Sequence, residues 1–282
     1  MKIAVIGATG FIGHHLVEAL LNAGLDVIAT GMTASKAAQF NWFDKVNFLA
    51  LTIENPQQSQ LEKLAAADKI IHLVWSGLPN YTDLFHFEKN LMAHYQFIKS
   101  LVELGAKDIT ITGTCFEYGM KNGSLDEATM SDPQNPYALA KDTLRKFLQA
   151  LQTKIDFRLK WVRLFYMYGQ GQSPKSILSQ LDKALEKGDT VFNMSGGEQL
   201  RDYLPVEEVV KKILTISQHN DFDGIINCCN GSPISIRRLV DNYLKEKGKH
   251  IPLNLGYYPY PTFEPMSFWG NNEKYKAIFH GF

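Results

Sequence analysis

The chain has 282 residues, of which 45% are hydrophobic and 21% charged, as is ordinary for a soluble globular protein. Its 29 basic and 29 acidic residues balance, which argues against a nucleic acid or a membrane surface as a partner. The three cysteines, Cys115, Cys228 and Cys229, lack metal-ligand spacing, so we expect reduced thiols and no metal.

The N-terminal segment is too short and too interrupted by glycine to be the apolar part of a signal peptide. No apolar run approaches the roughly 20 residues that a membrane-spanning helix needs. We therefore expect a cytoplasmic protein.

The first part of the chain alternates strands and helices. Ile3–Ile6 is a short apolar run typical of a strand buried on both faces of a parallel sheet. Residues Phe11–Leu21 follow with helical spacing and stop at Gly24. Strands are expected at Val27–Thr30 and Val46–Leu51.

The alternation continues to the middle of the chain. We expect further elements at the helix Pro56–Ala67, the strand Lys69–Trp75, the helix Leu84–Leu104, the strand Asp108–Thr112 and a helix that starts at Asn135 and Pro136. Such alternation predicts an α/β fold with a doubly wound parallel sheet.

Three segments follow strands of this sheet, namely Gly7–Gly13, Trp75–Ser76 and Thr112–Thr114. Because ligands bind beyond the carboxyl ends of parallel strands, these segments should converge on one crevice.

The pattern loosens after about residue 165, where glycine and proline become denser. We predict a dinucleotide-binding Rossmann domain over 1–165, to which the chain returns near 205–230. A smaller mixed α/β lobe that binds substrate is expected to comprise 166–204 and 231–282.

The glycine-rich turn predicts a pyrophosphate site. Gly7 permits the tight turn, Gly10 lets the backbone approach the anion, and Gly13 allows the helix to pack close to the sheet. The alternative is a glycine-rich turn with no ligand, which the preceding strand and following helix disfavour.

Tyr137 and Lys141 lie four residues apart, so a helix places them on one face. A phenol can give a proton to a carbonyl oxygen, and a nearby cation favours its phenolate. An exposed tyrosine beside a solvated lysine is the alternative, and the glycine-rich turn argues against it.

These pieces resemble the extended short-chain dehydrogenase/reductase family, which comprises nucleotide-sugar epimerases, dehydratases and reductases. The matching segments are Gly7–Gly13, Ile71–Val74, Asn90, Thr114–Gly119, Tyr137 with Lys141, Arg163–Gly169, Arg201–Val206 and Asn227 with Gly231. The wording of Gly113–Gly119 and Gly197–Asp202 is similar to reductases of 4-keto-6-deoxy nucleotide sugars.

The resemblance implies roles for particular residues. Thr114 would be the catalytic hydroxyl beside Tyr137, and Lys141 would also hold the nicotinamide ribose. The predicted cofactor contacts are Gly7, Gly10, Phe11, Ile12, Gly13, Ser35, Lys36, Ile53, Leu73, Val74, Tyr137 and Lys141. The predicted substrate contacts are Ser76, Cys115, Glu117, Tyr166 and Arg201.

Arg201 is a candidate clamp for the diphosphate of a nucleotide sugar, because a guanidinium matches such oxygens bidentately. The alternative for Arg201 is an ion pair with Asp202 or Glu198.

Two departures from the family indicate the subtype. Gly31 stands where NAD-selective members carry an acidic residue, and Lys36 follows closely, so we expect NADP to be preferred over NAD. Cys115 and Phe116 replace the Asp-Glu pair that dehydratases use, so dehydration is not expected.

The sequence therefore predicts an enzyme that reduces the 4-keto group of a nucleotide-linked deoxy sugar, with hydride from NADPH and a proton from Tyr137. One alternative is a C4-epimerase that uses the same residues with bound NAD. Another is a non-catalytic NADP-binding sensor or scaffold. The resemblance also implies a homodimer formed through the helices at 84–104 and 136–151.

Overall fold

The computed structural model describes residues 1–262 and 264–279, and its centre is a parallel sheet of seven strands. The strand order is β12-β7-β5-β4-β1-β2-β3, and all six pairings are parallel. The strands are β1 Lys2–Ile6, β2 Asp26–Gly31, β3 Asn47–Ala50, β4 Lys69–His72, β5 Asp108–Thr114, β7 Arg158–Leu164 and β12 Gly224–Cys228. The predicted doubly wound Rossmann sheet is confirmed.

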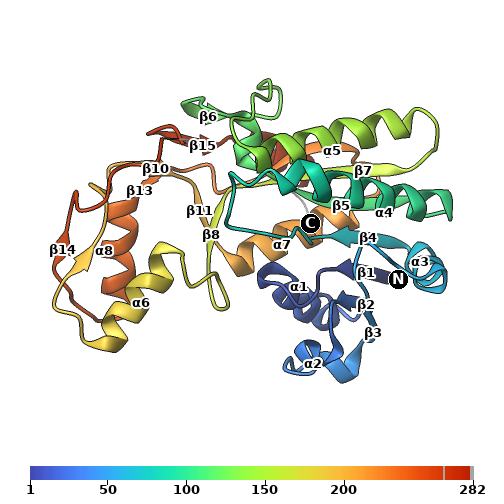
Figure 1. Cartoon of the computed structure of the whole chain (residues 1–282), viewed down its shortest axis with the longest axis horizontal. Coiled ribbons are helices and arrows are strands. Elements are labelled where there is room, and N and C mark those ends of the chain that lie inside the picture. Colours follow the sequence, from blue (N-terminus) through green and yellow to red (C-terminus); the bar gives the residue numbers. More distant parts are fainter. Residues whose placement is uncertain (263, 280–282) are drawn as a thin grey trace.

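Helices cover both faces of this sheet (Figure 1). One face carries α1 Phe11–Asn22 and α7 Val206–Gln218, whose apolar sides share a buried core with β1 and β2. The other carries α3 Gln58–Ala65, α4 Leu91–Glu103 and α5 Pro136–Gln152. Two shorter helices, α2 Ala34–Ala37 and α9 Glu273–Phe279, follow β2 and β15. Burial on both sides explains the apolar runs in β1 and β2, whereas β5 and β7 also carry buried polar side chains.

The segment after β4 differs from the predicted strand Lys69–Trp75 and helix Leu84–Leu104. The paired strand ends at His72, and the next residue, Leu73, donates its N–H to the carbonyl oxygen of Ile6. The first turn of the predicted helix is a π-helical turn, His86–Asn90, and α4 begins only at Leu91. His86 of this turn contacts Trp75 and Tyr137, as described below.

The remaining elements form a lobe beside the sheet, at the left of Figure 1. The lobe has its own core, in which α6 Ile177–Lys187 and α8 Ile236–Glu246 pack together. Its short strands are β9 Phe192–Asn193, β10 Leu200–Arg201, β13 Ile234–Ser235 and β14 Leu253–Asn254.

Two parallel pairs connect the lobe to the sheet region. These pairs are β8 Tyr166–Tyr168 with β11 Tyr203–Pro205, and β15 Phe268–Gly270 with β6 Gly123–Leu125. Four residues of the predicted lobe, Phe263 and 280–282, lie outside the described residues. Within the described ranges, no helix is long and apolar enough to cross a membrane.

Candidate active site

The glycine-rich turn between β1 and α1 is a compact cradle of backbone. Gly7 has a φ of +92°, and a Cβ on it would lie 3.0 Å from the backbone nitrogen of Val74. A Cβ on Gly13 would lie 2.2 Å from the carbonyl oxygen of Gly7, so no larger residue fits there. Gly10 is the N-cap of α1 and has no side chain over the free N–H groups of the first turn. The turn therefore fits a dinucleotide pyrophosphate, which such N–H groups bind.

The end of β2 offers no carboxylate near this cradle. Residues Gly31 to Lys36 contain no acidic side chain. A Cβ on Gly31 would lie 2.9 Å from side-chain atoms of Thr9, so the strand end accepts a larger side chain only if Thr9 moves. Ser35 and Lys36 are exposed on α2, which Thr33 caps by accepting the N–H of Lys36. Cationic and hydroxyl groups are thus the only charged or polar side chains that this strand end presents to solvent.

The predicted catalytic residues come together at the end of β5 and the start of α5. Asn135 caps α5 by accepting the N–H of Ala138, and the helix places Tyr137 and Lys141 on its buried face. Thr114 ends β5, and its hydroxyl is hydrogen-bonded to the phenol of Tyr137. The Nζ of Lys141 donates to the carbonyl oxygen of Thr112 at 2.8 Å.

Burial controls the protonation of this group. It raises the pKa of Tyr137 well above the usual range, with further increases from Tyr81 and Glu117, while the hydrogen bond from Thr114 lowers it. We expected Lys141 to lower the pKa of Tyr137, but the increase caused by burial is larger. Burial also lowers the pKa of Lys141 to about 7, against a smaller increase from Glu117. The phenol is a protonated acid at neutral pH, and the lysine is close to its midpoint.

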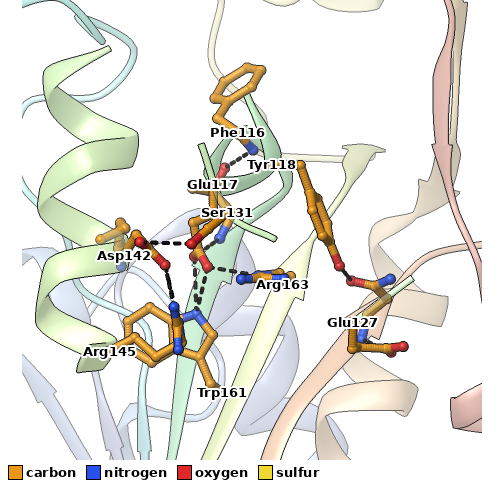
Figure 2. Close-up of polar contacts among 12 residues, drawn as sticks. Phe116, Glu117, Tyr118, Glu127, Ser131, Asp142, Arg145, Trp161 and Arg163 are labelled. Atoms are coloured by element: carbon orange, nitrogen blue, oxygen red, sulfur yellow. Dashed lines mark hydrogen bonds and ion pairs between the residues drawn. The ribbon is translucent and has the colours of Figure 1, made fainter. Parts of the chain in front are cut away.

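Glu117 does not line the crevice, which corrects its prediction as a substrate contact. Its side chain is completely buried, and Figure 2 shows its carboxylate between the side chains of Trp161 and Arg163. The carboxylate accepts from Trp161 Nε1 at 3.0 Å and from Arg163 Nε at 2.7 Å. It also accepts the backbone N–H of Thr114 at 2.9 Å. Glu117 thereby fixes the turn that begins at Thr114.

Cys115 and Tyr118 are packing residues in the same turn. Both are buried in a small core together with Phe165 and Cys229. Burial raises the pKa of the Cys115 thiol, so the thiolate that a base or nucleophile needs is disfavoured. Cys115 thus offers the crevice little surface for the predicted substrate contact.

Arg201 does not present a free guanidinium to the crevice. Its Nε and Nη2 atoms donate to one carboxylate oxygen of Glu264, at 3.2 and 2.9 Å, and Nη1 donates to the carbonyl oxygens of Leu200 and Met266. The hydroxyl of Tyr166 donates to the same Glu264 oxygen at 2.7 Å. Neither of the expected alternatives, Asp202 or Glu198, is its partner. Asp202 instead accepts the N–H groups of Asn230 and Gly231.

The other residues predicted to contact the cofactor or the substrate differ in how deeply they are buried. Leu73 and Val74 are half-buried beside Gly7, and Ile53 is buried beyond β3. Phe11 and Ile12 are half-buried at the start of α1. Ser76 is exposed, and its carbonyl oxygen accepts from Asn90, which anchors the loop after β4.

Sequence reasoning missed Tyr81 and His86 beside Tyr137, and it placed Trp75 at the crevice without assigning the indole a role. Trp75 and His86 place their rings 6.0 and 5.4 Å from the Tyr137 ring, and Tyr81 lies 5.5 Å away. The backbone N–H of Tyr137 donates to the carbonyl oxygen of Tyr81. Trp75 and Tyr81 lie in the irregular segment after β4, where no periodicity exists to indicate which side chains turn inward, and His86 lies in the π-helical turn that follows. The position of Trp75 directly after a strand was the one available signal.

An open cavity of about 460 Å³ lies beside the crevice, in the lobe. It does not include Tyr137, but it shares the ring of Tyr203, which contacts Tyr166. Polar side chains that line it include Asn230, Ser232, Ser235, Arg238, Asn242, Tyr243 and Glu246.

Fold and site together indicate a Rossmann-type protein with a glycine-rich turn and a buried tyrosine–lysine pair. Comparison with known proteins gives the family. Residues 3–229 match the NAD dependent epimerase/dehydratase family, and the chain belongs to it.

Related proteins of known activity include both dehydrogenases and epimerases. The dTDP-6-deoxy-L-talose 4-dehydrogenase (NAD(+)) of Aggregatibacter actinomycetemcomitans is 31% identical over 96% of this chain and 99% of its own length. The UDP-glucose 4-epimerase of Halalkalibacterium halodurans is 23% identical over 99% and 89%. The protein is thus an enzyme of the NAD-dependent nucleotide-sugar epimerase and dehydrogenase family.

Solved structures show the same fold. MoeE5 in complex with UDP-glucuronic acid and NAD superposes with a TM-score of 0.84 at 21% identity, covering 99% of this chain and 93% of that one. The UDP-glucuronic acid 4-epimerase of Bacillus cereus, also with NAD, gives 0.83 at 24% identity over 99% and 93%.

Proposed function

We infer that the protein reduces the 4-keto group of a nucleotide-linked deoxy sugar, with Tyr137 as the general acid. The observation that carries this function is the buried Tyr137 phenol, whose raised pKa keeps its proton available at neutral pH. A group that donates a proton must hold it at the working pH, and a reduction consumes one proton for each hydride.

Thr114 supports the developing alkoxide. Its hydroxyl is hydrogen-bonded to Tyr137, so both can reach one oxygen atom of a substrate. Glu117 holds the Thr114 backbone, which keeps the two hydroxyl groups in register. A bound nicotinamide supplies the hydride, and Gly7, Gly10 and Gly13 form the backbone cradle that would hold its pyrophosphate.

Two further observations favour reduction over dehydration. Cys115 and Phe116 take the places after the catalytic threonine, so neither offers a carboxylate for removing a proton next to a carbonyl. The relative from Aggregatibacter actinomycetemcomitans is a 4-dehydrogenase, and reversal of a dehydrogenation at C4 is a reduction of a 4-keto group.

We propose that Arg201 receives the substrate diphosphate by exchanging Glu264 for it. The Glu264 carboxylate shows that an anion can be seated on the guanidinium at this point. Glu264 belongs to a segment of irregular structure, and its side chain is 13% exposed. The neighbouring cavity would then take the nucleoside, because it shares Tyr203 with the crevice.

We propose that the enzyme prefers NADP to NAD. The strand end from Gly31 to Lys36 lacks a carboxylate that would repel a 2′-phosphate, and Lys36 would attract one. The names of two relatives specify NAD(+) and NAD(P)(+), so the family admits either cofactor. Values of kcat/KM with NADPH and NADH decide, and a clear preference for NADH would contradict the proposal.

The second candidate is a C4-epimerase, which several epimerase relatives favour. An epimerase regenerates its cofactor in each cycle, whereas a reductase consumes NADPH in proportion to product. Nicotinamide fluorescence with a series of 4-keto nucleotide sugars, followed by NMR of the product, separates the two. Stoichiometric loss of NADPH supports the reductase, and interconversion of 4-hydroxy sugars without net loss supports the epimerase.

We also propose a homodimer through α4 and α5. Met92, Leu139 and Phe147 on these helices are more than 36% exposed, and Phe147 contacts Tyr95 across the two helices. Light scattering on the wild type and on Phe147→Glu tests it, because a buried glutamate would dissociate the dimer.

A further inference from the structure

The indole of Trp75 lies beneath the catalytic pair and contacts four side chains. The Nζ of Lys141 is 4.2 Å from the centre of its ring. The ring of His94 stacks on it at 4.3 Å with an interplanar angle of 16°, and Trp75 Nε1 donates to His86 Nδ1 at 3.0 Å. Trp75 also contacts Tyr137, so one ring touches both members of the catalytic pair.

Both histidines are fixed in place behind this indole. His94 Nδ1 is 3.1 Å from His72 Nε2, and His86 Nε2 is 2.7 Å from the carbonyl oxygen of Asn80. All three histidines are at most 1% exposed. The indole therefore has little freedom to move away from Lys141.

Lys141 differs from the other buried lysines in how its charge is compensated. Lys69 and Lys160 both donate to the carboxylate of Asp108, at 2.7 and 3.0 Å. Lys141 is in no ion pair within the described ranges, and its ammonium contacts the Thr112 carbonyl and the Trp75 ring. The titratable groups that face it from the surrounding elements are His72 of β4, His94 of α4, Glu117 after β5 and Tyr137 of α5.

We propose that Trp75 is a positioning residue that stabilises the protonated form of Lys141 through its ring face and aims the ammonium at the Thr112 side of the crevice. An indole face attracts a cation most strongly when both are shielded from water, as they are here. His72 and His94 carry no positive charge at neutral pH, because burial lowers the pKa of His72 to about 3 and that of His94 well below its usual value. They can therefore support the ring without repelling the lysine. This role rests on the proposed catalytic use of Lys141.

The test replaces Trp75 with mono-, di- and trifluorotryptophan by site-specific incorporation. Fluorine withdraws electron density from the ring face with little change in shape. The ¹³Cε resonance of Lys141, identified by its loss in Lys141→Arg, is titrated in the cofactor-free protein. We expect the pKa of Lys141 to fall stepwise with fluorine content, by roughly one unit in total. An unchanged pKa across the series would mean that the indole provides shape alone.

Two controls isolate the ring face. The same fluorinated residues at Trp42, which is buried and stacks on Phe40, should leave the Lys141 titration unchanged. Benzothienylalanine at position 75 removes the N–H to His86 and keeps the aromatic face, so the Lys141 pKa should stay within a few tenths of a unit. If benzothienylalanine reproduced the full fall, the hydrogen bond to His86 would be responsible and the proposal would be wrong.

The titration is independent of catalysis. Failure of the proposed reductase function would appear as absent turnover with a normal fluorine dependence of the Lys141 pKa. Failure of the Trp75 role would appear as a flat fluorine dependence in an enzyme that turns over.

Discussion

Lys141 on the Rossmann side and Arg201 on the lobe side are both buried cations, but they differ in their partners. On the Rossmann side, the ammonium of Lys141 is buried with a carbonyl oxygen and an aromatic ring as its contacts. On the lobe side, the guanidinium of Arg201 is held by the carboxylate of Glu264 and two carbonyl oxygens. Both cations are at most 2% exposed, so burial does not distinguish them.

This difference separates the part of the site that is already assembled from the part that must rearrange to bind an anionic ligand. A carboxylate beside Lys141 would hold the ammonium in one ion pair and raise its pKa. Burial instead lowers the pKa of Lys141 to about 7. Four of the five N–H donors of Arg201 are used within the protein, two of them on Glu264, so we propose that an anionic ligand binds bidentately by replacing Glu264. We therefore regard the Rossmann side as preformed and the lobe side as the part that rearranges.

The largest expected effect is on turnover, at the preformed side. Tyr137→Phe removes the acid and keeps the ring contacts with Trp75 and His86. We expect kcat to fall about 10²- to 10⁴-fold while the Kd for the nicotinamide cofactor is unchanged. Stopped-flow hydride transfer and fluorescence titration measure the two. Substantial residual kcat would show that another group supplies the proton.

The next effect is on stability, beneath the same side. Glu117→Gln leaves the guanidinium of Arg163 buried without its charged partner, and should lower the free energy of unfolding by about 3–5 kcal/mol. Urea unfolding measures it. Glu273→Gln, which breaks an exposed pair with Lys276, is the matched control and should leave stability nearly unchanged. Equal small losses in both variants would refute the assigned role of Glu117.

The third effect is a pH dependence of kcat/KM that follows from the titration of Lys141. Because the pKa of Lys141 in the folded protein is lowered to about 7, its ammonium loses its proton as pH rises through neutrality. We expect kcat/KM to fall about tenfold per pH unit above that value, since Tyr137 keeps its proton there. Lys141→Arg stays charged, so its profile should be flat over the same range, at a lower maximum. A wild-type profile level up to pH 9 would contradict this assignment.

A smaller effect tests the lobe side. Glu264→Gln removes the charge that competes for Arg201, so a nucleoside diphosphate should bind several-fold more tightly, as calorimetry would measure. Weaker or unchanged binding would show that Arg201 stabilises the lobe and does not bind the diphosphate.

The smallest effect concerns cofactor choice. Lys36→Glu should reduce the preference for NADPH over NADH by about two- to fivefold, since an exposed charge contributes little. The ratio of kcat/KM for the two cofactors measures it. Lys63→Glu, a reversal on the exposed surface of α3, is the control.

The sequence by itself determined five of the seven strands of the sheet, the glycine-rich cradle and the helix that carries Tyr137 and Lys141. Each of these depends on local patterns, such as the apolar run before Gly7 or the cap at Asn135, whose geometry is set within a few residues. Only the tertiary structure decided that Glu117 is buried against Arg163, 46 residues away, and that Glu264 reaches Arg201 from 63 residues further on. It also decided that Trp75, from an irregular loop, lies against Lys141. Pairings of this kind depend on which surfaces the packed elements bring together, and no periodicity along the chain encodes them.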